Sequence, residues 1–256
     1  MITIGIDIGS ITAKGAVMKN STVLATKVLF TGYNSKKIGQ TLFDHLLKKT
    51  QFSSTDISRV VSTGYGRNNV DFSDKTITEI TCHAAGVFFQ NTSIRTIIDI
   101  GGQDSKAISI NEMGKVLDFA MNDKCAAGTG RFLEVMARAL EVDLENFGAL
   151  SLKAEHPSTI SSLCTVFAES EVISLISKGE PREDIMSGIH NSIASRVSSL
   201  TKRVGVIDPI MMTGGVAKNS GVVKALEKKL NKPILVSKWA QENGAIGAAI
   251  LASKIG

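Results

Sequence analysis

The chain has 256 residues, of which 43% are apolar and 21% charged, and only 4 are prolines. This is a globular composition, with enough residues to bury a substantial core in one or two domains. The net charge of +5 comes from dispersed lysine pairs rather than a basic block, so it argues against a nucleic-acid partner.

The N-terminal residues and the number of cysteines indicate the cellular compartment of the protein. The first residues lack the basic start and long apolar stretch of a signal peptide, and no apolar run reaches the roughly 18 residues that cross a bilayer. The 3 cysteines are an odd number, which does not suggest a disulfide framework. We therefore expect a cytoplasmic protein without a membrane partner, whose cysteines are core residues, nucleophiles or metal ligands.

Strand and helix signals alternate along the chain, which predicts an α/β fold. Short β-branched or apolar runs, the first two of them followed by glycine, predict strands over residues 2–8, 96–100, 210–212 and 234–236. Apolar side chains at helical spacing predict helices near 79–85, over 132–140 and 166–176, from Pro181 to Val204, and over 216–230 and 240–252.

The first two expected strands carry a repeated motif. Ile6-Asp7-Ile8-Gly9 recurs as Ile98-Asp99-Ile100-Gly101, and a lysine follows seven residues after each aspartate, at Lys14 and Lys106. Because a solenoid needs at least three units, two copies favour an internal duplication into two related lobes that face each other. The lobe boundary is expected near residues 84–95. We therefore expect lobes of residues 1–90 and 91–256, with a final helix that can pack back on the first lobe.

Each repeated turn is a candidate phosphate site. A glycine at a strand end lets backbone N–H groups approach a phosphate, whereas an aspartate must act through Mg²⁺ or water. In the first turn, the hydroxyls of Ser10 and Thr12 and the charge of Lys14 are suited to the β- and γ-phosphates. The candidate nucleotide contacts of this turn are Ser10, Ile11, Thr12, Ala13 and Lys14.

The second turn, Gly101-Gly102-Gln103-Asp104, offers backbone amides together with a side-chain amide and a carboxylate. These groups can hold a metal-bound or attacking water. Asp7 and Asp99 are the candidates for Mg²⁺ binding and water positioning. The expected catalytic set is Asp7, Asp99, Gln103 and Asp104, and Gly101, Gly102 and Gln103 are also expected to contact the nucleotide.

A third glycine turn follows the expected strand at 210–212. Gly214 and Gly215 leave bare backbone against which a flat base or a ribose can lie, and a last glycine-containing segment starts at Gln241. In this order the motifs resemble the phosphate-1, phosphate-2 and adenosine motifs of the actin, heat-shock-chaperone and sugar-kinase superfamily. The resemblance implies ATP in a cleft between two lobes, with Gly214, Gly215 and Gln241 as contacts. No Walker P-loop is present, and Gly128-Thr129-Gly130-Arg131 lacks the preceding strand that a phosphate loop needs.

Two cysteines, Cys125 and Cys164, stand near the starts of expected helices. A helix N-terminus lowers the pKa of a thiol, so both sulfurs are placed to be thiolates, although either can also be a small core residue. A [4Fe–4S] cluster takes four thiolates, which a two-fold dimer would supply, and zinc accepts the same four sulfurs. Cys82 precedes His83 on an expected helix, where their side chains diverge by about 100°. We read Cys82 as a core residue.

The segments around both cysteines, Asn122 to Gly130 and Cys164 to Glu171, resemble the activators of 2-hydroxyacyl-CoA dehydratases, within the BadF/BadG/BcrA/BcrD-type ATPases that also include subunits of benzoyl-CoA reductase. Thr63 to Arg67 and the three glycine turns match as well. The resemblance implies a homodimer that holds one [4Fe–4S] cluster through Cys125 and Cys164 of each subunit.

It further implies an ATP-driven one-electron donor, reduced by a ferredoxin or flavodoxin, which reduces an iron–sulfur partner enzyme. The implied partner is a dehydratase or related reductase that acts on an acyl-CoA, or else a reductase that carries a double-cubane cluster and reduces small molecules. Two alternatives use the same fold: a sugar or amino-sugar kinase, which has no use for paired cysteines, and a non-catalytic, nucleotide-dependent assembly protein.

Overall fold

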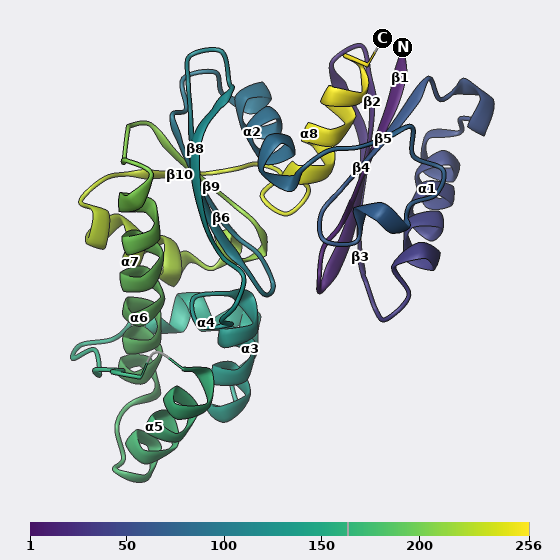
Figure 1. Ribbon diagram of the computed structural model, residues 1–256. Helices are drawn as coiled ribbons and strands as arrows, with labels where there is room; N and C mark the ends of the chain where they lie inside the picture. The colour runs from purple at the N-terminus through teal and green to yellow at the C-terminus, as the bar shows by residue number, and fades with distance from the viewer. Residues whose placement is uncertain (163, 256) are drawn as a thin grey trace. The chain divides into compact units, whose positions relative to one another are not determined.

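The computed structural model describes residues 1–162 and 164–255 and has an α/β architecture (Figure 1). The described residues form two five-stranded sheets, ordered β3-β2-β1-β4-β5 and β10-β9-β6-β7-β8. Among these residues, none of the helices combines the length and apolar character that crossing a membrane requires.

The elements follow one another as the sequence analysis expects for an α/β chain. The strands are β1 Ile2–Ile8, β2 Thr12–Lys19, β3 Thr22–Phe30, β4 Arg59–Thr63, β5 Lys75–Thr76, β6 Thr96–Ile100, β7 Ser105–Ile110, β8 Val116–Asn122, β9 Ile210–Thr213 and β10 Ile234–Val236. The α-helices are α1 Ser35–Thr50, α2 Glu79–Gln90, α3 Gly130–Ala139, α4 Leu144–Ser151, α5 Thr165–Ser177, α6 Arg182–Arg203, α7 Ser220–Leu230 and α8 Asn243–Ala252. Short 3₁₀ helices are η1 Ser54–Asp56, η2 Arg67–Asn69 and η3 Gly215–Lys218.

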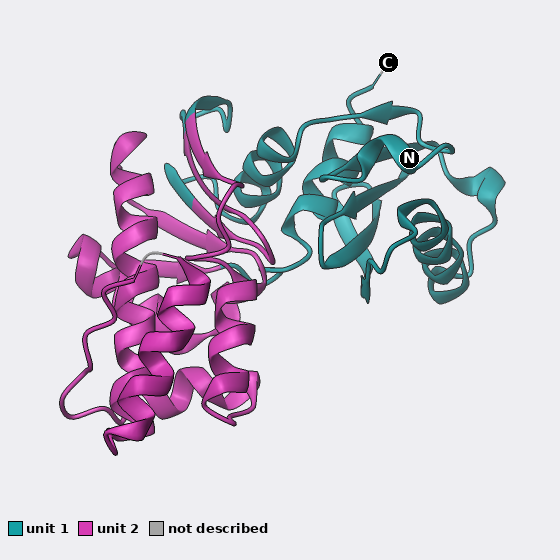
Figure 2. Cartoon of the chain, turned by 60° about the horizontal axis from the view of Figure 1, so that its bottom comes forward, with its two compact units in different colours: residues 1–97, 110–118, 237–256 teal, residues 98–109, 119–236 magenta. Residues whose placement is uncertain are grey.

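Contacts group the chain into two compact units (Figure 2). The first unit consists of residues 1–97, 110–118 and 237–256, and the second of residues 98–109 and 119–236. The lobe boundary expected near residue 90 separates the two copies of the repeated motif, which is a different division from units defined by contacts. This boundary stays a prediction.

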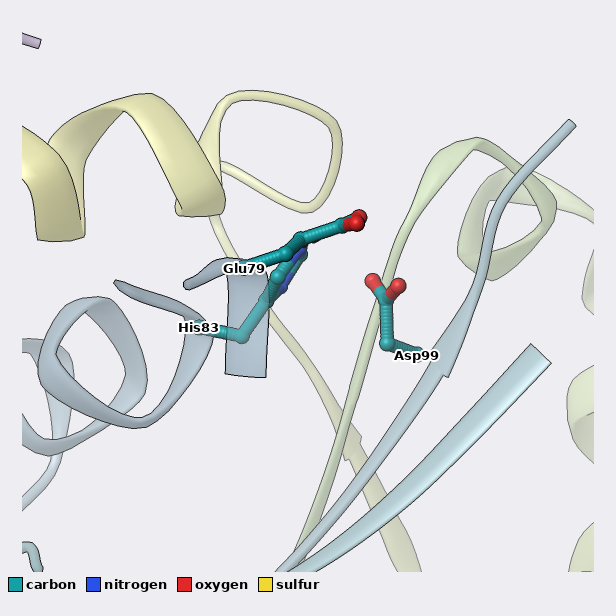
Figure 3. A group of neighbouring side chains, drawn as sticks. All are labelled: Glu79, His83 and Asp99. Carbon is teal, nitrogen blue, oxygen red and sulfur yellow. Dashed lines mark ion pairs between the residues drawn. The ribbon is translucent and has the colours of Figure 1, made fainter. Parts of the chain in front are cut away.

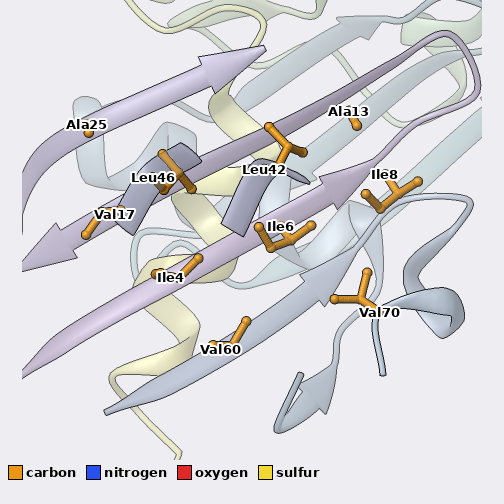
Figure 4. Packing of buried hydrophobic residues seen from close by; sticks show 10 residues of the cluster. All are labelled: Ile4, Ile6, Ile8, Ala13, Val17, Ala25, Leu42, Leu46, Val60 and Val70. Atoms are coloured by element: carbon orange, nitrogen blue, oxygen red, sulfur yellow. The ribbon is translucent and has the colours of Figure 1, made fainter. Parts of the chain in front are cut away.

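In the first unit, alternation along β1 assigns its side chains to two faces of the sheet. Ile4, Ile6 and Ile8 are fully buried and pack with Leu42 and Leu46 of α1 (Figure 4). At about 25 cal/mol per Å² of buried apolar surface, each such side chain contributes roughly 1.5–3 kcal/mol. This cluster holds α1 on one face of the first sheet.

The intervening residues of β1 face α8. A Cβ on Gly5 would lie 1.9 Å from the carbonyl oxygen of Ala245, so only glycine lets the strand and the helix approach this closely. Thr3 Oγ1 donates a hydrogen bond of 2.8 Å to the carbonyl oxygen of Ala249. The same alternation brings Asp7, near the carboxyl end of β1, to the first turn of α8, where its Oδ2 lies 2.9 Å from a Cβ built on Gly244.

In the second unit, α6 presents the apolar stripe that the sequence predicts. The stripe residues are buried and run along the helix as Ile185, Ile189, Ile193, Val197, Leu200 and Val204. Its last two members pack with Ala107 of β7 and Ala120 of β8. This contact anchors α6 on strands of the second sheet.

The expected strands at 2–8, 96–100 and 234–236 are confirmed with those bounds. The single helix expected over 216–230 is wrong, because η3 ends at Lys218 and α7 starts anew at Ser220. Asn219 separates them: its side chain caps α7 by accepting a hydrogen bond from the N–H of Val222. Pro181 is the N-cap of α6 rather than its first helical residue.

Candidate functional site

The first repeated turn joins β1 to β2 and carries an ion pair at its base. Asp7 and Lys14 are direct partners in the antiparallel register of these strands, and Lys14 Nζ lies 3.5 Å from Asp7 Oδ2. The Asp7 side chain is buried, whereas that of Lys14 is 15% exposed. A hydrogen bond of 3.1 Å from the N–H of Gly9 to the carbonyl of Thr12 closes the turn. The arrangement places a cation and a buried carboxylate beside a tight glycine turn.

The second turn, between β6 and β7, has the same construction. The N–H of Gly101 donates to the carbonyl of Asp104 at 2.9 Å, as Gly9 does to Thr12 in the first turn. Lys106 Nζ lies 3.2 Å from Asp99 Oδ2 and 2.8 Å from Asp104 Oδ2, and its side chain is 1% exposed. The repeat read in the sequence is therefore a repeat of structure, with one difference: Lys106 contacts two carboxylates.

Asp99 is also tied to the third glycine turn. Thr213 Oγ1, at the end of β9, donates a hydrogen bond of 2.8 Å to Asp99 Oδ1. Gly214 has φ +85, and a Cβ there would lie 2.2 Å from the carbonyl oxygen of Ile100, so this position needs glycine. The second and third motifs are thus one connected site within the second unit. Thr213 was not among the predicted site residues, although it directly precedes the glycine pair.

The first residues of α3 support the second turn. The N–H of Gly130 donates to the carbonyl of Gly101 at 2.9 Å, and that of Arg131 donates to Gly102 at 2.8 Å. The prediction that no strand precedes Gly128 to Arg131 was wrong, because β8 ends at Asn122. These helix N–H groups nevertheless bond to protein carbonyls, so the segment fixes the shape of the second turn.

The other nucleotide candidates differ in accessibility. Ser10 and Gln103 are exposed, while Ile11, Thr12 and Gly102 are half-buried. The side chain of Ala13 is fully buried in the core of the first unit, so only its backbone can contact a ligand. Two candidates start or precede helices: Gly215 begins η3, and Gln241 lies in the turn before α8.

The structure distinguishes the three cysteines. Cys164 is exposed and is the N-cap of α5, as the sequence predicts, whereas Cys125 is half-buried in the loop between β8 and α3. Cys125 precedes the first turn of α3, which begins at Gly130, by several residues, so only Cys164 directly adjoins a helix. Cys82 is fully buried, and burial raises the pKa of its thiol to about 12. The interpretation of Cys82 as a core residue is confirmed.

Local hydrogen bonds hold both thiol segments. Asn122 Nδ2 donates to the carbonyl of Cys125 at 2.8 Å, and Thr129 Oγ1 donates to Ala126 at 2.6 Å. Glu171, on α5, accepts from the N–H groups of Ser161 and Ser162 and from the Ser161 hydroxyl, at 2.9–3.1 Å. Although burial opposes the effect, these hydrogen bonds hold the pKa of the Glu171 carboxyl below its usual value. Glu171 is therefore an ionised anchor for the segment that leads to Cys164.

Helix α5 itself carries a large exposed apolar surface. The side chains that make up this surface, which we call the α5 face, are Val166, Phe167, Ile173 and Ile176, with exposed fractions of 40–67%. Ala168 and Val172 form the buried side of the helix, and α5 packs on α3. Apolar side chains gathered on one exposed helix are typical of a protein interface.

Comparison with known proteins identifies relatives along the whole chain. The model of the BadF/BadG/BcrA/BcrD ATPase family matches residues 4–252. The 2-hydroxyisocaproyl-CoA dehydratase activator of Clostridioides difficile is 49% identical over 98% of this chain and 95% of its own. Its structure with bound ADPNP has a TM-score of 0.93. The (R)-2-hydroxyglutaryl-CoA dehydratase activating ATPase of Acidaminococcus fermentans is 46% identical over 98% of this chain and 97% of its own.

A more distant likeness concerns the fold alone. A ROK family glucokinase from Streptomyces griseus, solved with glucose and AMPPNP, has a TM-score of 0.62 at 16% identity and is covered over its full length. The chain thus has the actin and sugar-kinase type of α/β fold, as its motifs predict.

Proposed function

The chain belongs to the BadF/BadG/BcrA/BcrD ATPase family, and from this premise we propose that it is an ATP-dependent one-electron donor that activates an iron–sulfur partner enzyme. It is an ATPase, and the predicted resemblance to activators of 2-hydroxyacyl-CoA dehydratases is confirmed. The proposed partner is such a dehydratase or a related reductase. The observation that carries the proposal is the presence of a half-buried Cys125 and an exposed Cys164 in a chain that also has two copies of the same glycine turn.

We assign nucleotide binding to the glycine turns. The relative solved with ADPNP supports ATP and ADP as ligands. Backbone N–H groups of the two repeated turns and the ammonium of Lys14 bind the phosphates, and Gly214, Gly215 and Gln241 contact the nucleoside. Asp7 and Asp99, together with Gln103 and Asp104, hold Mg²⁺ and orient water. Mg²⁺ supplies the positive charge that phosphoryl transfer requires.

We assign metal binding to Cys125 and Cys164. Their accessibility fits a centre on the surface of the chain, and two thiols per chain are half of the set that a [4Fe–4S] cluster takes. When bound, such a cluster supplies one-electron transfer. Asn122 and Glu171 fix the two cysteine segments, so these residues set where the thiolates stand.

The second half of the ligand set comes from a second copy of the chain. The α5 face begins two residues after Cys164, so an interface built on α5 would bring the Cys164 segments of two subunits together. A two-fold axis then supplies four thiolates from two identical pairs. A ferredoxin or flavodoxin in the cytoplasm is the proposed source of the electron.

The fold also serves sugar kinases, yet the likeness to the glucokinase at 16% identity shows the fold only. A kinase needs no such pair of cysteines, and several relatives that match nearly the full length, among them the Clostridioides difficile protein, are dehydratase activators. We therefore retain the electron donor as the proposed function.

The cysteine assignment is tested with single substitutions. We expect Cys125→Ser and Cys164→Ser each to abolish cluster binding while ATP binding persists, because neither sulfur lies in a glycine turn. The measurement is an anaerobic visible and EPR spectrum with the iron content per dimer, alongside the binding of an ATP analogue.

The third cysteine provides the matched control. Cys82→Ala removes a thiol that is buried in the core, so the iron content should remain at the level of the unaltered protein. A normal iron content in both Cys125→Ser and Cys164→Ser would refute the cluster assignment. Absence of ATP hydrolysis in the unaltered protein would instead count against the nucleotide half of the proposal.

A further inference from the structure

Helices α2 and α8 of the first unit pack unusually closely. A Cβ on Gly247 would lie 1.7 Å from the carbonyl oxygen of Cys82, and one on Gly86 would lie 2.4 Å from the carbonyl oxygen of Asn243. Both positions therefore need glycine. The close approach buries two polar side chains against each other, because Asn243 is 0% and His83 3% exposed.

A chain of hydrogen bonds fixes which atom of the Asn243 amide is the donor. Gln90 Nε2 donates to the carbonyl of Gly86 at 3.2 Å, which identifies it as the amide nitrogen. The same nitrogen donates to Asn243 at 2.8 Å, so the accepting atom is Asn243 Oδ1. Ser237 Oγ completes the chain at Gln90 Oε1, at 2.8 Å. The remaining Asn243 atom, Nδ2, can only donate.

The amide of Asn243 in turn fixes the tautomer of His83. Asn243 Nδ2 contacts both the carbonyl oxygen and the ring Nδ1 of His83, each at 3.1 Å. Because Nδ2 donates, Nδ1 must be the acceptor, and a neutral imidazole then carries its proton on Nε2. His83 is thereby held as a directed N–H donor on a rigid helix.

The Nε2 atom lies near two carboxylates, that of Glu79 and that of the candidate site residue Asp7. It lies 3.6 Å from Oε1 of Glu79, one helical turn away, and Figure 3 shows the two side chains leaving α2 in the same direction. A Cβ built on Gly244 would lie 3.2 Å from His83 Nε2 and 2.9 Å from Asp7 Oδ2. His83 Nε2 and the Asp7 carboxylate therefore flank the same glycine in the first turn of α8.

We propose that His83 is a positioning residue for ATP hydrolysis that acts through Asp7, with Asn243 fixing its tautomer. The inference rests on the proposed function of Asp7 at the first phosphate turn. A donor at Nε2 orients the Asp7 carboxylate, or the water which that carboxylate binds, without giving up or accepting a proton. Partners in this position fix the orientation of metal and water ligands, and their loss costs about 10- to 100-fold in metal affinity or activity.

The test compares variants that keep or remove the donor. In His83→Asn the amide takes the place of Nδ1, whereas in His83→Gln an N–H reaches the place of Nε2. We expect His83→Asn to lower kcat for ATP hydrolysis by about 10- to 100-fold, with the affinity for an ATP analogue nearly unchanged. His83→Gln should recover part of the loss. Cys82→Ala, on the same helix but facing the core, should leave kcat unchanged.

A second measurement reads the tautomer directly. The chain has 4 histidines, so ¹⁵N spectra of the imidazoles can be assigned by single substitutions. We expect His83 to carry its proton on Nε2, and Asn243→Asp, which exchanges the donor for an acceptor, to shift the proton to Nδ1 and to reduce kcat as His83→Asn does.

Several results would overturn the proposal: a proton on Nδ1 in the unaltered protein, equal losses in His83→Asn and His83→Gln, or a kcat that neither changes. Weaker binding of the ATP analogue with an unchanged kcat would also refute it, because His83 would then contribute to nucleotide binding rather than to hydrolysis. Failure of the unaltered protein to hydrolyse ATP would refute the proposed function of the site. In that case the ¹⁵N measurement of the His83 tautomer would still show whether Asn243 orients His83.

Discussion

The two lysines of the repeat show how one motif serves two purposes. Lys14 faces a single carboxylate and is 15% exposed, whereas Lys106 is 1% exposed between Asp99 and Asp104. Thr12 stands in the first turn where Asp104 stands in the second, so the first turn has one negative charge fewer. Lys14 therefore retains charge to offer a phosphate, and Lys106 compensates the buried Asp99 and the partly exposed Asp104.

This difference predicts different phenotypes. Lys14→Ala should weaken ATP binding by about 1.5–3 kcal/mol, the contribution of one charged hydrogen bond. Lys106→Met should lower the free energy of unfolding by about 3–5 kcal/mol, because it leaves buried charge uncompensated. Calorimetric titration with an ATP analogue and urea unfolding measure the two effects. Unchanged ATP affinity in Lys14→Ala would remove that residue from the phosphate site.

Individual site residues were predictable from the sequence only where a motif repeats. The seven-residue spacing marked the aspartate and the lysine of each copy as equivalent positions, and the structure adds that each aspartate forms an ion pair with the lysine of its own copy. Thr213 lies far along the chain from Asp99, and His83 lies far from Asp7, and a lone threonine or histidine carries no spacing signal toward these aspartates. Their positions follow from strand pairing and glycine-mediated helix packing, which only the structure provides.

Among the elements, α5 combines exposed apolar side chains with a candidate metal ligand at its start. Its exposed apolar side chains follow directly after Cys164, and leaving such a surface in water is unfavourable. We propose that the same face joins two subunits and shields the cluster. The interface and the metal centre would then be lost together.

A charge on this face tests the proposal. Phe167→Asp should convert the dimer into a monomer and remove the bound iron, while ATP binding remains, because Phe167 lies outside the glycine turns. Sedimentation velocity and iron analysis under anaerobic conditions measure both. Met113→Asp, at an apolar residue that is 66% exposed between β7 and β8, is the matched control and should remain dimeric. A dimer with full iron content in Phe167→Asp would exclude the α5 face as the interface.

The elements were more predictable from the sequence than their ends. The long stripe of α6 has a strong helical period, so its burial was expected and is observed. Residues 216–230 have the composition of one helix, yet the side chain of Asn219 caps a new helix and divides the segment. The loop of Cys125 was placed too close to a helix start for a similar reason: local hydrogen bonds from Asn122 and Thr129 decide the path of the backbone.

At the scale of the whole molecule, the proposed function requires the nucleotide to influence the thiols. One connection runs inside the second unit. The first N–H groups of α3 hold the carbonyls of Gly101 and Gly102, and the Cys125 loop leads directly into α3. If the second turn binds the phosphates as proposed, a change there on loss of the γ-phosphate would reach the Cys125 segment through the first residues of α3.

Coupling of this kind requires the ATP and ADP states to favour different conformations, since a ligand shifts an equilibrium only by its differential affinity. We predict that an iron chelator removes the cluster at different rates in the ADP state and in an ATP-like state. We also predict that the partner enzyme binds the ATP-like state more tightly, by about 5-fold or more. Reciprocity then requires the partner to raise the affinity for the ATP analogue by the same factor.

Lys14→Ala, measured at nucleotide concentrations that saturate it, should reduce the difference in chelation rate between the two nucleotide states, because its contact with the phosphates is lost. Equal chelation rates in both states, together with partner binding that is indifferent to nucleotide, would mean that the ATPase and the cluster operate in one protein without being coupled.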